Sequence, residues 1–137
     1  MRCPPCHSVL LLVLLSTPFA ARSERVVFEA VADATLVEAA DGDLANGGGA
    51  LFAGRTSQAT GSIRRALLQF DIAGSIPAGA TINSVTLSLN MDQSIVGAVT
   101  NNLHRATADW GEGASDAGGQ EGTGTTALPG DATWLHT

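Results

Sequence analysis

The fold class is decided by the stretch RALLQFDI at residues 65–72, the most apolar run after the first 21 residues of the chain. Side chains alternate between the two faces of an extended chain, so Leu68, Phe70 and Ile72 share one face. That face is wholly apolar, whereas the opposite one carries polar side chains that include Asp71. We therefore predict a β-strand whose apolar face lies against the core, where each of its three side chains contributes about 1.5–3 kcal/mol.

The remaining sequence also has the pattern of short strands. At residues 85–91, Val, Leu, Leu and Met alternate with Thr, Ser and Asn, which is typical of a half-buried strand. Pro and Gly at residues 76–79 indicate a turn, and the glycines of residues 39–50 and 111–130 indicate loops, the second a long surface loop. No helical period is sustained, so we predict an antiparallel sandwich or barrel. Further strands are expected at residues 26–31, 35–37, 51–53 and 99–107, and another is expected to begin at residues 131–135.

Composition limits the classes of protein to which the chain can belong. Its 137 residues suit one domain, and the 45% apolar content is too high for a disordered chain. Seven Arg and no Lys face 13 acidic residues, giving a formal charge of −6. This negative charge repels phosphates, so we do not expect a nucleic-acid partner.

The first 21 residues have the three parts of a secretory signal peptide. Arg2 precedes an unbroken apolar run at residues 9–15, and small residues follow at positions 20 and 21. The run is far shorter than the roughly 20 residues that span a bilayer. We therefore expect a leader at residues 1–21, with a retained N-terminal anchor as the alternative, and a secreted or cell-surface domain at residues 22–137 with no membrane span after cleavage. Cys3 and Cys6 fall in this leader, so we do not interpret their spacing as a redox or zinc motif.

Several motifs of the chain resemble those of the DNRLRE domain, which is grouped with carbohydrate-binding module family 96. They occur in order at residues 32–36, 46–48, 65–72, 76–82 and 85–89, followed by 110–113 and 131–134. The resemblance implies a jelly-roll-like β-sandwich that acts as a non-catalytic appendage of secreted and cell-surface proteins. Domains of that family continue for further strands beyond the tryptophan motif, so the sandwich is expected to be incomplete at its C-terminus.

Oxygen-bearing side chains in the loops suggest a possible calcium site, since Ca²⁺ takes six to eight oxygen ligands. The alternative is that these side chains are solvated, or in the case of Asp71 that it caps the following turn. The spacing excludes an EF-hand, because no Glu closes a twelve-residue loop. The candidate ligands are Asp33, Asp41, Asp43, Asn46 and Asp71.

Aromatic and charged side chains suggest a carbohydrate-binding surface, because sugars have apolar faces and polar edges. Trp110, with Glu112 nearby, is predicted to form a binding rim at the end of a strand, the alternative being a core-edge side chain packed against the sheet. Arg64 and Arg65 are the only adjacent basic pair and are candidates for clamping a carboxylate or sulfate, the alternative being solvation or pairing with nearby acids.

The sequence favours binding over catalysis. The carboxylates of residues 109–121 lie in or next to a glycine-rich loop, a poor place to hold an acid/base pair at a fixed separation, and no nucleophile or nucleotide motif is present. We therefore predict a secreted module, not an enzyme, that binds a polysaccharide or cell-surface glycan. A structural or adhesive module without sugar affinity is the first alternative, and part of a polysaccharide-degrading enzyme is the second.

Overall fold

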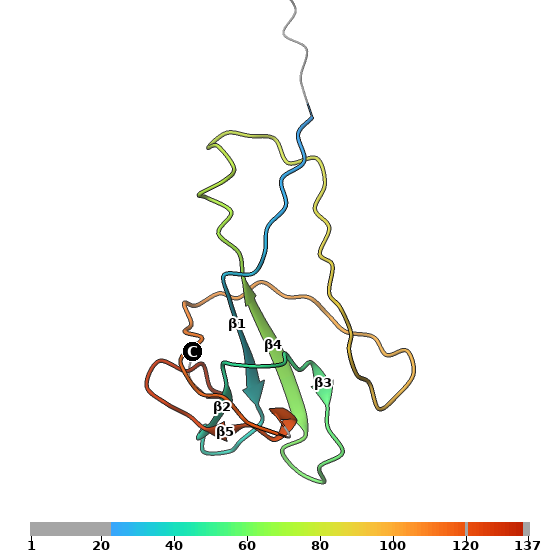
Figure 1. Ribbon diagram of the computed structural model, residues 1–137, viewed down its shortest axis with the longest axis vertical. Coiled ribbons are helices and arrows are strands. Elements are labelled where there is room, and N and C mark those ends of the chain that lie inside the picture. The colour runs from blue at the N-terminus through green and yellow to red at the C-terminus, as the bar shows by residue number, and fades with distance from the viewer. Residues whose placement is uncertain (1–22, 120, 136–137) are drawn as a thin grey trace, which may run out of the picture.

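A single antiparallel β-sheet forms the centre of the computed structural model, which describes residues 23–119 and 121–135 (Figure 1). The prediction of an all-β protein is confirmed. Its spatial strand order is β3-β4-β1-β2-β5, and every neighbouring pair is antiparallel. The elements are β1 (Ala32–Val37), β2 (Leu44–Asn46), β3 (Gly54–Arg55), β4 (Ile63–Gln69), the 3₁₀ turn η1 (Glu121–Thr123) and β5 (Thr125–Thr126).

The pairing of β1 with β4 is the longest in the sheet and extends from Ala32 opposite Gln69 to Val37 opposite Arg64. Paired residues share a face, so Thr35, Val37 and Arg64 lie on one face of the sheet. Ala34 and Leu36 lie on the other face. All five side chains are at least 92% buried, which shows that both faces of the sheet are covered at its centre.

The cover comes largely from residues 111–135, which we call the C-terminal segment. The amides of Gly47 and Gly48 both donate to the Ser115 carbonyl at 2.9 Å, and β5 pairs with β2. Gly124, at φ +74°, lies where a Cβ would come within 2.8 Å of the Val37 side chain, so only glycine lets the chain approach β1 this closely. The prediction of a surface loop at residues 111–130 was therefore only partly right: most of the described stretch is irregular, but Ser115 and Ala117 are buried and Thr125–Thr126 form β5.

The strand predictions were partly right. The strand expected at residues 65–72 is β4, shifted by two to three residues towards the N-terminus, and residues 35–37 are the end of β1. Leu68 and Phe70 are only half-buried and Ile72 is 49% exposed, because the centre of the core lies nearer the start of β4. Residues 26–31, 51–53 and 131–135 contribute no complete strand; β1 and β3 begin just after the first two of these stretches.

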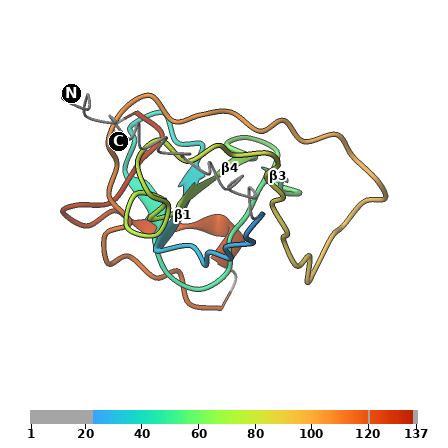
Figure 2. The same ribbon diagram turned by 90° about the horizontal axis from the view of Figure 1, so that it is seen from above.

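Residues 72–107, which we call the arm, form no strand, so the predictions for 85–91 and 99–107 were wrong. The arm follows β4 and makes the predicted turn, with a hydrogen bond from the Ala80 amide to the Pro77 carbonyl (3.1 Å). Its first half extends beyond the end of the sheet, and its second half returns beside the sheet (Figures 1 and 2). The described residues therefore form one sheet, and the second sheet of a jelly roll is not among them.

The predicted leader, with Cys3 and Cys6, lies outside the described residues. Within the part of the chain that the structure describes, no helix is long and apolar enough to cross a membrane.

Candidate functional site

The two adjacent arginines predicted as an anion clamp lie on opposite faces of the sheet, as expected for neighbours in a strand. Arg64 is 97% buried, whereas Arg65 is exposed. The structure therefore does not bring the two guanidinium groups together, and each must be considered by itself.

Arg64 joins the sheet to the loops that cover it. Its guanidinium donates to the carbonyls of Gly122 (2.7 Å), Gly61 (2.7 Å) and Ile63 (2.8 Å), and to Oε1 of Gln58 (2.6 Å). Burial lowers the pKa of Arg64, while the nearby charge of Glu38 raises it in part. All four acceptors are neutral oxygens on three different loops or strands, so this side chain has a structural role in the folded protein.

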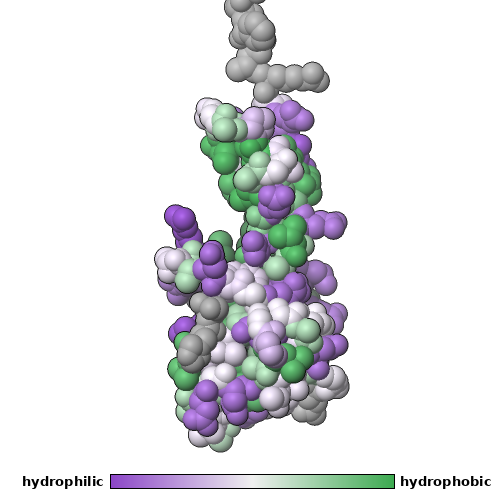
Figure 3. Space-filling view, turned by 90° about the vertical axis from the view of Figure 1, so that its left-hand side faces the viewer, coloured by the Kyte–Doolittle hydropathy of each residue, from purple (hydrophilic) through white to green (hydrophobic). Residues whose placement is uncertain are grey.

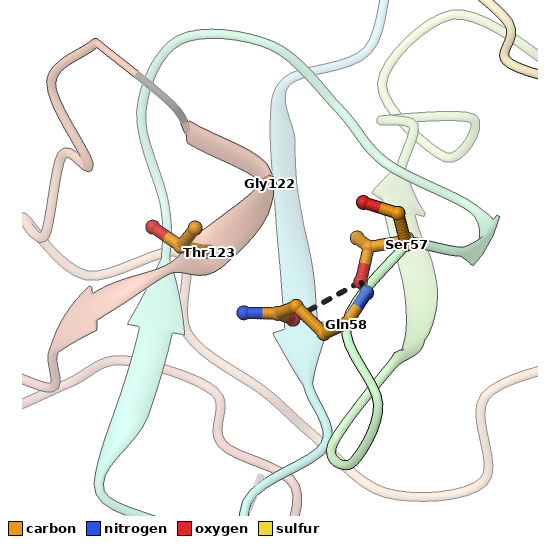
Figure 4. Close-up of a pocket in the computed structure, with 5 residues that line it drawn as sticks. Ser57, Gln58, Gly122 and Thr123 are labelled. Carbon is orange, nitrogen blue, oxygen red and sulfur yellow. Dashed lines mark hydrogen bonds between the residues drawn. The ribbon is translucent and has the colours of Figure 1, made fainter.

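A small cavity of about 150 Å³ lies between two of these partners, Gln58 and Gly122 (Figure 4). Oε1 of Gln58 accepts from Arg64 and from the Thr56 hydroxyl (3.0 Å), which fixes the amide. Its nitrogen is then turned to the side of Thr123, as Figure 4 shows. Pockets that enclose ligands usually measure ~300–1,000 Å³, so this cavity is too small to hold more than part of one. Its lining residues are Thr56, Ser57, Gln58, Gly122 and Thr123.

On the other face of the sheet, the exposed Arg65 stacks on Trp134. The guanidinium carbon lies 4.4 Å from the centre of the indole ring, within the range of a cation–π interaction. Trp134 is half-buried, so part of its ring remains accessible. The pair combines an aromatic surface with several N–H donors, which are the two kinds of group that sugar recognition needs.

The predicted rim residues Trp110 and Glu112 are both half-buried. The Ala132 amide donates to the Gly111 carbonyl at 2.9 Å, so the segments that carry Trp110 and Trp134 run next to each other. The two tryptophans thus come from adjoining segments that are far apart in sequence.

A carboxylate holds these adjoining segments in place. Asp131 accepts hydrogen bonds from the backbone amides of Leu128 (2.6 Å), Ala114 (2.9 Å) and Ser115 (3.3 Å). Partial burial raises the pKa of Asp131, but these amides and the Ser115 hydroxyl outweigh it, and the net result is a lowered pKa. The ionised Asp131 carboxylate therefore stabilises the conformation on which the position of Trp134 depends.

The candidate calcium ligands do not assemble. Asn46 is buried, and its amide oxygen accepts from the Ala117 amide (2.9 Å). Asp71 accepts from the Gly74 amide (3.1 Å), which is the turn-capping role considered as its alternative. Among residues 23–119 and 121–135, no three His, Cys, Asp or Glu side chains lie close enough to hold a metal ion, so Asp33, Asp41, Asp43 and Asp71 form no cluster.

One of the carboxylates considered for acid/base chemistry has a structural partner instead. Glu121 accepts a short hydrogen bond from the Ala50 amide, which ties η1 to the loop after β2. Glu121 therefore holds the C-terminal segment against the loop that follows β2.

Sequence reasoning missed two features of this region. We interpreted Arg64 as an anion clamp or a solvated side chain, although it has the same parity as Leu68, for which we predicted a core position. Trp134 was placed at the opening of a strand, and nothing in the sequence links it to Arg65, which is 69 positions away.

A comparison of the chain with known protein families, curated proteins and solved structures found no match. The resemblance to the DNRLRE domain accordingly stays a prediction.

Proposed function

We propose that the chain is an exported, non-catalytic module that binds a polysaccharide or cell-surface glycan. The observation that supports this most directly is the stacked pair of Arg65 and Trp134 at the surface of the sheet. The secretory pattern of residues 1–21 and the resemblance to a carbohydrate-binding family point in the same direction.

The pair suits a sugar ring for physical reasons. The C–H groups of a pyranose pack on an indole face, and its hydroxyls need donors and acceptors at the ring edge. Arg65 lies over the indole ring of Trp134 and supplies donors there, so a sugar would contact the part of the ring that the guanidinium leaves open. Trp110 and Glu112, on the adjoining segment, would extend the same surface.

The test is affinity gel electrophoresis of the protein in gels that contain cellulose derivatives, xylan, soluble chitin or alginate. We expect retardation by at least one polysaccharide, lost in Trp134→Ala and reduced in Arg65→Ala. His104→Ala, in the arm, is the matched control and should migrate like the wild type. Circular dichroism of each variant checks that the sheet is retained. The proposal is wrong if no polysaccharide retards the protein, or if Trp134→Ala is retarded as strongly as wild type.

A structural or adhesive module is the second candidate, and the arm is the observation that favours it. Leu89 is 67% exposed and Met91 78%, which is unusual for apolar side chains of a monomer when they lie in one segment. Self-association through this segment without sugar binding would support the second candidate over the first.

A further inference from the structure

The arm presents an apolar surface that the rest of the described chain does not cover. On the face shown in Figure 3, hydrophobic side chains gather in the part of the molecule that extends beyond the sheet. Ten large apolar side chains of the arm are exposed by 40% or more. They are Ile72, Ile82, Val85, Leu87, Leu89, Met91, Ile95, Val96, Val99 and Leu103.

The sheet itself offers the arm no place to pair. Both faces are covered at the centre, where Val37 is 1% exposed and Ala34 2%. The two edge strands, β3 and β5, are only two residues long, too short to accept a seven-residue strand. The sheet therefore does not supply a partner strand for residues 85–91.

We propose that this partner is the same segment of a second copy of the chain, paired antiparallel about Ser88. In this register Val85 lies opposite Met91 and Leu87 lies opposite Leu89, in both directions. The register keeps the parity of the strand, so all eight apolar side chains of the two copies gather on one face of the new ribbon. The sequence is thus complementary to itself, which a two-fold dimer requires.

Charge favours contact through the arm over contact through other surfaces. The formal charge of the chain is −6, but residues 72–107 carry only Asp92 and Arg105, whose charges cancel. In the proposed register Asp92 lies opposite Ser84, so the two copies of Asp92 stand eight residues apart, or ~27 Å. That is well beyond the screening length of about 8 Å at physiological salt, and like charges do not oppose the pairing. Centring the pair on Asp92 instead would place like charges face to face.

The backbone of the proposed strand also allows this pairing. No proline lies in residues 85–91, so each of their amides can donate to a partner strand.

The first test is sedimentation velocity of the full chain between about 1 and 100 µM. We expect a concentration-dependent dimer, and Leu89→Asp should weaken association at least about tenfold, because the new carboxylate would face Leu87 of the other copy. Val27→Asp is the matched control, since Val27 is 74% exposed but lies outside the arm, and it should dimerise like the wild type.

A second test addresses the register. Leu87→Asp and Leu89→Lys should each be monomeric alone, whereas their equimolar mixture should form a mixed dimer with the new acid opposite the new base. Hydrogen exchange of the wild type should show protection of residues 85–91 that increases with concentration.

The proposal is overturned by any of three results: a monomer at every concentration, protection of residues 85–91 that does not depend on concentration, or a dimer that persists in Leu89→Asp. The second result would show that another segment of the same chain covers the arm.

Discussion

Residues 85–91 alternate between apolar and polar side chains more regularly than residues 63–69, yet only the second stretch is a strand. β4 has β1 beside it in a ladder of six residue pairs. The arm has no strand paired with it, and its first half extends beyond the end of the sheet (Figure 1). The difference teaches that alternation selects which side chains share a face, whereas a hydrogen-bonded neighbour decides whether a strand forms.

The largest difference is expected within β4 itself, between the buried Arg64 and the exposed Arg65. We expect Arg64→Ala to lower the free energy of unfolding by about 3 kcal/mol, since it leaves the carbonyls of Gly61 and Gly122 without their donor. Arg65→Ala should cost about 1 kcal/mol or less, the usual strength of an exposed cation–π contact. Urea unfolding of both variants measures the difference. Equal losses would mean that Arg64 is not an anchor of the sheet.

A pair of valines compares the sheet with the arm directly. Val37 is 1% exposed and Val85 is 83% exposed. We expect Val37→Ala to cost about 2 kcal/mol, because it removes buried methyl groups next to Gly124. Val85→Ala should stay within about 0.5 kcal/mol at concentrations where the chain is monomeric. A large loss at Val85 in thermal unfolding would show that the arm is packed within one molecule.

The contribution of Asp131 to the free energy of unfolding should depend on pH, whereas that of Asp92 in the arm should not. Asp131→Ala should cost about 1–2 kcal/mol at pH 7, because three backbone amides lose their acceptor. The pKa of Asp131 is lowered in the folded protein, so its contribution is complete above about pH 5 and is lost as the pH falls through the folded-state pKa. Asp92→Ala in the arm is the control and should show no such trend. Denaturant unfolding between pH 2 and 7 provides the measurement, and a difference that persists unchanged at pH 2 would contradict this role.

The smallest effect is expected for calcium. Because the candidate ligands form no cluster in the described residues, the melting temperature should be the same in 5 mM CaCl₂ and in EDTA, within about 1 °C. Differential scanning fluorimetry is sufficient for this test. A calcium-dependent increase that disappears in Asp41→Asn would revive the predicted site.

Much of the sheet could be predicted from the sequence, but its cover could not. β4 and the end of β1 were predicted because apolar and β-branched residues are concentrated there. β2 was missed because three residues, Leu44–Asn46, stand in a glycine-rich loop and become a strand only beside β1. The C-terminal segment was taken for a surface loop because its contacts are made by backbone groups and by single polar side chains such as Ser115. Such contacts leave no periodic signal in a sequence.

The candidate site shows the same limit. From the sequence we identified Arg65 as a site residue but paired it with Arg64, because only adjacency in sequence suggested a partner. The actual neighbour of Arg65 is Trp134, and the hydrogen bonds of Asp131 and Ala132 determine that position. Long-range pairs of this kind follow from the tertiary fold alone.

The distance in sequence between the sheet and its cover has a consequence for how the protein folds. The amide oxygen of Asn46 accepts its hydrogen bond from Ala117, 71 residues later in the chain. The outer edge of β2 pairs only with β5, which begins at Thr125. During synthesis, β1 to β4 emerge long before the segment that encloses them, at about 5–20 residues per second. Contacts between residues so far apart in sequence form slowly. Until they form, Asn46 and the outer edge of β2 remain exposed to water. Chaperones that bind nascent chains would therefore have their longest opportunity in the interval between Gln69 and Ala117.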